Sequence, residues 1–308
     1  MEKELAIIGG GIAGVSCALY AKRAGITPVV FEKTAIGGQL AYINRVDNYP
    51  GIKMGMKGVE LLEVLKTSLE ELDIEVIGEE VRSVKEEDKK IVISTPAGEY
   101  TCSVLVIATG ASFRKLEVEG EKELAGKGVS WCAICDGYFF RGKDVAVIGG
   151  GNTAVEEAVY LSSLCRKVYL IHRRDKLRAM DYLQKELLER KNIEVVWNSK
   201  VRRILGKDFV EKIELEDTKK NTVSTLSVNA LFIAIGIEPN TDIFKGLISI
   251  DEKGFIITDE EMKASLPFIY ACGDCRRRPL RQLITAAAEG AVAALSAYKY
   301  IKGSYVSY

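Results

Sequence analysis

The stretch Gly9-Gly10-Gly11-Ile12-Ala13-Gly14 decides the fold because of what surrounds it. An apolar segment, 5–8, precedes it and predicts a strand, and residues 15–24 have the pattern of an amphipathic helix that ends at Gly25. A second apolar segment, 28–31, predicts the next strand. Strand, glycine turn, helix and strand in this order are typical of a dinucleotide-binding βαβ unit.

The glycines of this turn have separate roles. Gly9 permits the tight turn, Gly11 lets a pyrophosphate approach the backbone, and Gly14 lets the helix pack on the strand. The N-terminus of the helix then faces the negative charge of the phosphates. Glu32 lies 21 residues after Gly11, where a carboxylate accepts hydrogen bonds from ribose hydroxyls. These residues predict an unphosphorylated adenosine ribose, as in FAD or NAD.

The same unit recurs 140 residues later as an internal repeat. A strand pattern over 144–148 leads into Gly149-Gly150-Gly151-Asn152-Thr153-Ala154, and a helix pattern over 155–164 and a strand pattern over 168–171 follow. Two further apolar strands, over 104–110 and 231–236, each end in glycine, and each is expected to complete one of the two units. A strand pair is also expected around 255–257. The predicted fold class is therefore α/β, with two Rossmann-like domains of three-layer ββα architecture, the second inserted in the first.

The carboxylate of the first unit has no counterpart in the second. The position equivalent to Glu32 holds His172, which is followed by Arg173 and Arg174, with Arg178 about one turn further. A carboxylate would repel a ribose 2′-phosphate, whereas guanidinium groups pair with it through charge-assisted hydrogen bonds. The second unit is therefore predicted to bind NADPH.

A cysteine pair, Cys132-Ala133-Ile134-Cys135, lies just before the second glycine turn and is followed by Asp136. A C-x-x-C pair alone serves zinc sites, redox couples and core cysteines alike. Between two nucleotide fingerprints, it predicts a redox-active disulfide. Cys272 and Cys275 form a second such pair, which lies too far from the first for a zinc ribbon, so no metal site is expected.

The composition argues against several classes of function. Lys plus Arg and Asp plus Glu each total 43, so the net charge is zero and no global field attracts nucleic acid or an anionic membrane. No apolar run approaches the roughly 20 residues that span a bilayer, and no secretory signal is recognisable. The seven cysteines are too scattered for a secreted disulfide scaffold. We expect a cytoplasmic protein that binds neither nucleic acid nor membrane.

Taken together, these segments resemble the low-molecular-weight thioredoxin reductases of bacteria and archaea over nearly the whole chain. The resemblance rests on the two glycine turns, the cysteine pair, the arginine cluster and four further segments: Gly37-Gly38-Gln39-Leu40, Asn48-Tyr49-Pro50-Gly51, Gly273-Asp274 and Arg281-Gln282. It implies FAD in a split domain, 1–113 and 243–308. It also implies NADPH in the domain 114–242, which carries the cysteine pair.

The resemblance also implies which residues contact each cofactor. Those expected at FAD are Gly9, Gly11, Ile12, Ala13, Gly14, Glu32, Lys33, Gly38, Gln39, Leu40, Asn48, Val81, Thr109, Gly110, Asp274, Arg281, Gln282 and Leu283. Those expected at NADPH are Gly149, Gly151, Asn152, Thr153, Ala154, His172, Arg173, Arg174 and Arg178.

The implied reaction carries electrons from NADPH through FAD and the cysteine pair to thioredoxin or a similar small redox protein. By resemblance, Cys135 faces the flavin, Cys132 attacks the partner and the enzyme is a homodimer. Asp136 is the expected proton donor, because the only histidine of the chain is assigned to NADPH. The aromatic residues Tyr138 and Phe139 are expected to receive the partner.

Two other functions stay open on the sequence. The same scaffold reduces ferredoxin or flavodoxin in some enzymes, but that reaction has no use for the cysteine pair. A redox sensor would register the state of its cysteines without turnover. Consumption of NADPH with a disulfide acceptor, lost in Cys135→Ser, would exclude both.

Overall fold

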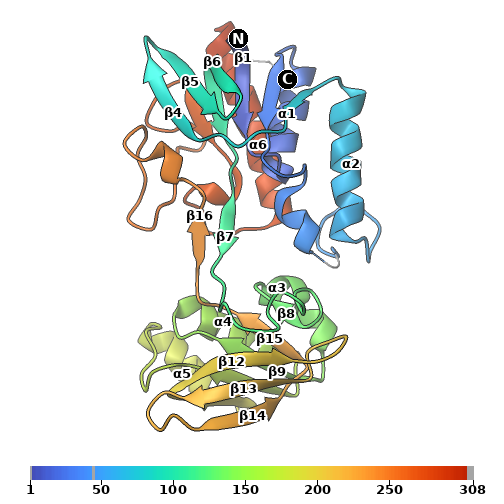
Figure 1. Ribbon diagram of the computed structural model, residues 1–308, viewed down its shortest axis with the longest axis vertical. Coiled ribbons are helices and arrows are strands. Elements are labelled where there is room, and N and C mark those ends of the chain that lie inside the picture. Colours follow the sequence, from blue (N-terminus) through green and yellow to red (C-terminus); the bar gives the residue numbers. More distant parts are fainter. Residues whose placement is uncertain (1, 44–45, 304–308) are drawn as a thin grey trace. The chain divides into compact units, whose positions relative to one another are not determined.

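The computed structural model describes residues 2–43 and 46–303, and the chain divides into two compact units. Unit 1 comprises Met1–Ser112 and Glu238–Tyr308, and unit 2 comprises Phe113–Ile237. The two connecting segments, β7 (Ala111–Phe113) and β16 (Ile237–Pro239), pair with each other as a two-stranded ribbon (Figure 1). Unit 2 is thus an insertion in the sequence of unit 1.

A seven-stranded sheet forms the centre of unit 1, in the order β3-β2-β1-β6-β5-β4 with β17 beside β6. Strands β1, β2, β3 and β17 run parallel to their neighbours, whereas β5 is antiparallel to both β4 and β6. The strands are β1 (Glu2–Ile8), β2 (Pro28–Phe31), β3 (Glu75–Ile77), β4 (Ser83–Glu87), β5 (Lys90–Thr95), β6 (Gly98–Ile107) and β17 (Ile269–Ala271).

Unit 1 has three α-helices among its described residues, of which α1 follows the glycine turn and α6 is rich in alanine. They are α1 (Ile12–Arg23), α2 (Gly58–Glu71) and α6 (Leu283–Lys302), with short 3₁₀ turns η1 (Gly38–Tyr42), η3 (Asp242–Phe244) and η4 (Gly273–Cys275). Helix α1 begins at Ile12, three residues before the predicted start, so the last three residues of the glycine stretch already belong to the helix. The small residues of α6 bury one face against the core of unit 1.

Helices α1 and α6 approach so closely that one position between them must be glycine. A Cβ atom added to Gly290 would lie 2.1 Å from the carbonyl oxygen of Ala13. The same crossing carries a hydrogen bond from Ser16 Oγ to the carbonyl oxygen of Ala287, 2.7 Å long. Helix α6 therefore packs against the start of α1 and fixes the position of the glycine turn.

Unit 2 has the three layers that the sequence predicted (Figure 1). Its parallel sheet has the order β11-β10-β9-β15-β8, and one apolar cluster joins this sheet to the helices while another joins it to an antiparallel sheet, β12-β13-β14. The elements are β8 (Val129–Ser130), α3 (Ala133–Asp136), η2 (Gly137–Phe140), β9 (Asp144–Ile148), α4 (Asn152–Ser162), β10 (Lys167–Ile171), α5 (Asp181–Glu189), β11 (Ile193–Val196), β12 (Ser199–Leu205), β13 (Lys212–Asp217), β14 (Val223–Ser227) and β15 (Ala230–Ile233).

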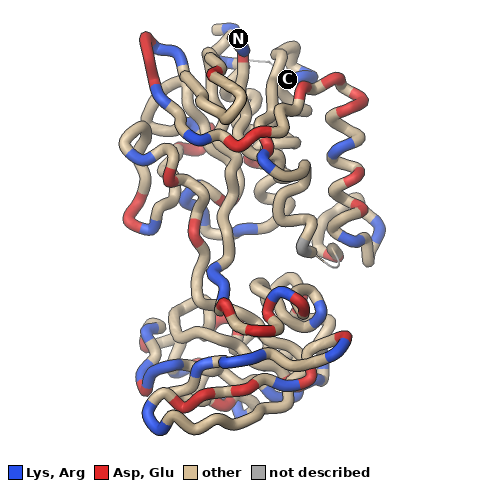
Figure 2. The backbone as a smooth tube through the Cα atoms, in the orientation of Figure 1, with Lys and Arg blue, Asp and Glu red and all other residues tan. Residues whose placement is uncertain are grey.

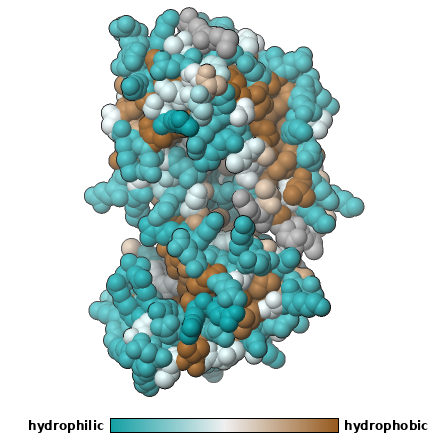
Figure 3. All heavy atoms as spheres, in the orientation of Figure 1, coloured by the Kyte–Doolittle hydropathy of each residue, from teal (hydrophilic) through white to brown (hydrophobic). Residues whose placement is uncertain are grey.

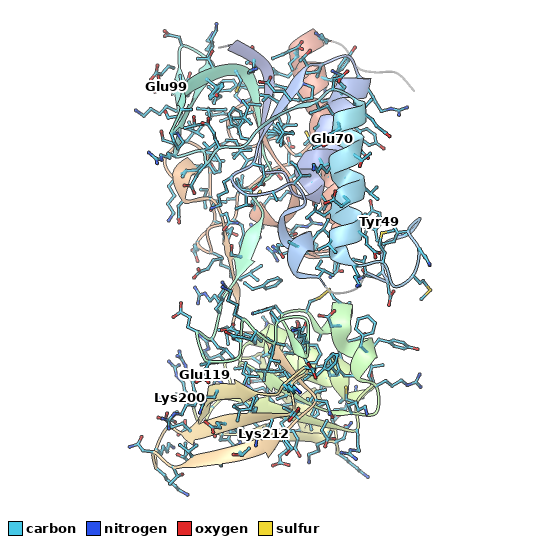
Figure 4. All side chains as sticks on the ribbon, turned by 45° about the vertical axis from the view of Figure 1, so that its right-hand side comes forward. Tyr49, Glu70, Glu99, Glu119, Lys200 and Lys212 are labelled. Carbon is cyan, nitrogen blue, oxygen red and sulfur yellow. A yellow bond between two sulfur atoms is a disulfide. The ribbon has the colours of Figure 1, made fainter. Side chains whose placement is uncertain are left out.

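One surface ion pair ties the segment before the first strand of unit 2 to its antiparallel sheet. Glu119, labelled in Figure 4 beside the strand that carries Lys200, forms an isolated bridge with Arg203 of β12. The Glu119 carboxylate also pairs with the Arg203 guanidinium at 2.5 Å. Both side chains are well exposed, so we expect this pair to add less than about 1 kcal/mol to stability.

The sequence also predicted a strand pair around 255–257, and this prediction is wrong. The region makes only isolated bridges, from Ile256 to Ile250 and to Arg276. The carboxylate of Asp251 accepts hydrogen bonds from the backbone amides of Lys253 and Phe255, both 2.9 Å long. This local turn takes amides that a ladder would need, so no extended pair forms.

Charge is spread without a face of one sign. Basic and acidic residues are interspersed over both units (Figure 2), and the visible surface is mostly hydrophilic with separate apolar patches (Figure 3). In the parts of the chain that the structure describes, no helix is both long and apolar enough to cross a membrane.

We predict that Gly290→Ala destabilises unit 1 by about 1–3 kcal/mol or more, because the added methyl group collides with backbone rather than with a movable side chain. Gly78→Ala is the matched control, since a Cβ atom there meets nothing within 4 Å. Thermal unfolding should show a clearly lower midpoint only for Gly290→Ala. Equal midpoints for the two variants would contradict the close helix crossing.

Candidate functional site

The first glycine turn leaves the start of α1 open. Gly11 is the N-cap residue and no side chain caps the helix there, while a Cβ atom added to Gly11 would meet nothing within 4 Å. A Cβ atom on Gly14 would lie 1.9 Å from the carbonyl oxygen of Gly9, so this position requires glycine for helix and strand to pack. Free amides beside open space are what a pyrophosphate requires.

Glu32 closes this turn from the second strand. Its Oε2 accepts a hydrogen bond of 2.8 Å from the Gly10 amide, and its Oε1 accepts one of 2.9 Å from the Thr34 amide. The carboxylate is therefore fixed at the end of β2, where a ribose is expected. Lys33 beside it is exposed and pairs with Glu80.

The remaining residues expected at FAD come from distant segments of unit 1. Asn48 Nδ2 donates to Gln282 Oε1 at 3.0 Å, and Gln39 Nε2 donates to the carbonyl oxygen of Ala111 at 2.5 Å. Thr109 Oγ1 donates to the carbonyl oxygen of Asn240 at 2.7 Å. Leu40 is buried, and Val81, Gly110 and Leu283 are partly buried.

Three buried polar atoms of unit 1 lack a hydrogen-bond partner among the described residues. They are Asp274 Oδ1, Arg278 Nε and Arg281 Nε. Burial raises the pKa of Asp274 and lowers that of Arg281, as desolvation disfavours both charged forms. Orphaned polar groups of this kind fit a ligand with hydroxyl and phosphate groups, so the residues present suit FAD. The contact of each residue with FAD stays a prediction.

No sequence motif marks Glu289, the acid that holds this region together. Glu289 of α6 accepts a hydrogen bond of 2.9 Å from the Gly273 amide and pairs with Arg276 at 2.5 Å and with Arg278 at 3.1 Å. The Arg278 side chain is only 2% exposed. Glu289 thus fixes the turn that carries Asp274. Only contacts across the fold reveal this role.

The second glycine turn repeats the geometry of the first. Gly151 is the N-cap of α4, which also lacks a side-chain cap, and a Cβ atom on Gly151 would meet nothing within 4 Å. Asn152 Oδ1 accepts a hydrogen bond from the Met180 amide, 3.0 Å long. Thr153 is exposed, while Ala154 is buried where the first turn has Gly14. The residues present therefore suit the pyrophosphate of a second dinucleotide.

His172 and the three arginines occupy different environments. His172 is buried under Gly150, its Nε2 lies 3.0 Å from the carbonyl oxygen of Lys176, and burial lowers its pKa. Its ring therefore supports the turn. Arg173, Arg174 and Arg178 are exposed, and none of them pairs with a carboxylate in the described parts of the chain. Free guanidinium groups beside the turn suit the 2′-phosphate of NADPH.

Cys132 and Cys135 form a disulfide at the start of α3. Cys132 is the N-cap, and its Sγ accepts a hydrogen bond of 3.2 Å from the Cys135 amide. That amide is placed to stabilise negative charge on the Cys132 sulfur once the bond opens.

Asp136 is held close to the pair by a residue that the sequence did not single out. Ser130 Oγ, at the end of β8, donates to Asp136 Oδ2 at 2.6 Å and accepts from the Cys132 amide at 3.1 Å. Burial raises the pKa of Asp136, and the bond from Ser130 partly offsets this. A carboxyl group that keeps its proton to higher pH is suited to protonate a leaving sulfur.

The other cysteines are inert by position. Cys272 and Cys275 are fully buried, with no disulfide between them, and Cys275 Sγ lies 3.4 Å from the carbonyl oxygen of Ile107. Burial raises the pKa of Cys275 to about 11. A thiol that stays protonated is a poor nucleophile. Electron transfer is therefore left to Cys132 and Cys135.

The chain is similar to known proteins over nearly its whole length. The family model of the pyridine nucleotide-disulphide oxidoreductases matches residues 3–290. A thioredoxin reductase of Coxiella burnetii is 41% identical, covering 97% of this chain and 96% of its own. One from Peptoclostridium acidaminophilum is 39% identical, with 98% of both chains covered.

A crystal structure of thioredoxin reductase from Streptococcus pyogenes superposes with a TM-score of 0.95, at 38% identity, covering 98% of this chain and 99% of that one. The fold class and the family resemblance predicted from the sequence are thereby confirmed. The chain belongs to the pyridine nucleotide-disulphide oxidoreductase family.

Proposed function

We propose that this protein is an NADPH-dependent flavoprotein that reduces the disulfide of thioredoxin, or of a related small redox protein, through FAD and the Cys132–Cys135 pair. The single observation that carries the proposal is the disulfide at the start of α3, in the same unit as an arginine-marked nucleotide turn. The near full-length similarity to thioredoxin reductases supports it.

The chain's own residues account for the thiol chemistry. FAD, when bound, supplies the electron pair that it receives from NADPH. Two electrons break the Cys132–Cys135 bond. Addition of one proton then converts one sulfur to a thiol, and the other sulfur remains a thiolate. The Cys135 amide stabilises charge on Cys132, and Asp136 supplies the proton.

The Cys132 thiolate then attacks the disulfide of the partner, and the resulting mixed disulfide is resolved by Cys135, which releases the partner in its reduced form. Tyr138 and Phe139 support the docking of this partner, since 63% and 39% of their surfaces are exposed. Phe140 instead packs edge-on against Phe232. Exposed aromatic side chains supply large contact area for a protein partner.

We further propose a homodimer in the cytoplasm. Unit 1 exposes several apolar side chains on its helices, which would suit an interface between copies: Tyr20, Val59, Val64, Ile284 and Val292. Five free buried cysteines suit a reducing compartment. Light scattering of the purified protein tests the dimer, and a monomer at micromolar concentration would refute it.

We predict that Cys135→Ser and Cys132→Ser each abolish NADPH-dependent reduction of thioredoxin, while NADPH still bleaches the flavin absorbance. Cys272→Ser is the matched control and should keep its turnover, since that thiol is buried and protonated. Turnover is followed by NADPH absorbance. Activity in the Cys135→Ser protein would exclude the proposed route.

We predict that Asp136→Asn slows disulfide reduction by about 10² to 10⁴, because the amide cannot donate a proton as a carboxyl does. Flavin reduction by NADPH should change little. In the parent protein disulfide reduction should slow as the pH rises through the raised pKa of Asp136. The rate of Asp136→Asn should not show this fall with rising pH. Stopped-flow measurement separates the two steps, and equal slowing of both would refute the role.

We predict that Arg174→Ala raises KM for NADPH about ten- to a hundredfold, since one charge-assisted hydrogen bond is worth about 1.5–3 kcal/mol. KM for NADH should hardly move. Lys191→Ala removes an exposed charge of the same unit and serves as the control. A parallel rise in both KM values would show that Arg174 does not read the 2′-phosphate.

A further inference from the structure

A second carboxyl group, that of Glu157, lies beside the dithiol. The thiol chemistry proposed above gives it no role. Glu157 of α4 accepts a hydrogen bond of 3.3 Å at Oε1 from the backbone amide of Ala133. This amide directly follows Cys132 and opens α3. The carboxyl group therefore contacts the backbone at the reactive cysteine from a neighbouring element.

The rest of the Glu157 carboxyl has no polar partner. Its Oε2 is buried without a hydrogen bond, and no Lys or Arg of the described residues forms an ion pair with it. Burial raises the pKa of Glu157 to about 7, the Ala133 amide opposes that rise, and the like charge of Glu156 adds to it. The group thus changes charge in the range where the thiols react.

The other charged groups on the elements that pack against α4 are occupied or face solvent. These elements are α3, α5, β9, β10 and β11. Asp136 binds Ser130, Asp144 pairs with Arg166, and Lys167 pairs with Glu194. The charged residues of α5, namely Asp181, Lys185, Glu186 and Glu189, are exposed. Glu157 is therefore the partly buried titratable group on α4 that contacts the backbone of the dithiol.

We propose that Glu157 is a positioning residue for the dithiol: through the Ala133 amide its carboxyl group governs how readily the Cys132 sulfur carries negative charge. When Glu157 is ionised, its charge lies next to the backbone of Cys132 and disfavours the thiolate. When it is neutral, the Cys135 amide stabilises the thiolate without that opposition. The two groups form a coupled pair, in which ionisation of either one disfavours ionisation of the other.

The proposal deepens the function proposed above and rests on it, and the thiol itself can test it. Glu157→Gln removes the charge but keeps an oxygen that can accept from Ala133. The reduced protein is alkylated with iodoacetamide across a range of pH, and modification of Cys132 is followed by mass spectrometry. We expect the pKa of the Cys132 thiol to fall by up to about one unit, and its thiolate fraction to rise up to about tenfold at pH values where Glu157 of the parent protein is ionised.

Glu156→Gln is the matched control, because it removes the same charge from the next residue, which is exposed. Its alkylation profile should stay close to that of the parent protein, because the charge of Glu156 is the smallest of the three influences on the pKa of Glu157. A Glu157→Gln profile that coincides with the parent, or an equal shift in Glu156→Gln, would overturn the proposal. Normal melting temperature and flavin absorbance establish that each variant is folded.

A measurement on the unaltered protein keeps the proposal falsifiable if Glu157→Gln fails to fold. In NMR of protein labelled at glutamate 13Cδ, Glu157 is the carboxyl expected to titrate near pH 7. Coupling requires its pKa to be higher in the dithiol form than in the disulfide form, since the thiolate adds negative charge beside it. The same pKa in both forms would overturn the proposal.

Parallel turnover assays separate this proposal from the function on which it rests. If the unaltered protein reduces thioredoxin but the pH profile of Cys132 alkylation is the same in Glu157→Gln, only the positioning role fails. If thioredoxin is not reduced although the profile shifts as expected, the proposed acceptor fails and the coupling of Glu157 to Cys132 stands.

Discussion

The rest of the structure depends on one constraint, which is that the helix starts at the two glycine turns must keep their amides free of side-chain caps. Helices α1 and α4 both begin after a glycine N-cap that offers no side chain, so the amides face open space. At α3 the reactive sulfur of Cys132 itself accepts an amide. Unpaired helix amides favour negative charge. Backbone amides at helix starts would thus stabilise the two pyrophosphates and the Cys132 thiolate through the same physical interaction.

Three carboxyl groups, each from another part of the chain, bind backbone amides beside the candidate sites. Glu32 accepts from Gly10, Glu289 from Gly273 and Glu157 from Ala133. In each case the acid binds a backbone amide beside the functional residue rather than the functional side chain. This arrangement fixes the turn while the site-facing groups stay free. Glu289 has the strongest support, since it also pairs with Arg276 and Arg278.

The sequence predicted the parts of the fold that local pattern determines. The apolar strands, the glycine turns and the internal repeat follow from residues close together in the chain, and the resulting elements and three-layer class were confirmed. The strand pair around 255–257 failed because the carboxylate of Asp251 takes the amides of Lys253 and Phe255. The role of Ser130 could not be predicted because no motif marks a serine that binds Asp136. The role of Glu157 could not be predicted because only tertiary packing brings it to Ala133.

The central claim is that the flavin and the Cys132–Cys135 pair form one electron-transfer chain fed by NADPH. Anaerobic titration of the purified flavoprotein measures it most directly. The account predicts that full reduction consumes about two electron pairs per chain, one for the flavin and one for the disulfide, and about one in Cys132→Ser. Uptake of a single electron pair by the unaltered protein, with the disulfide still intact, would contradict the account.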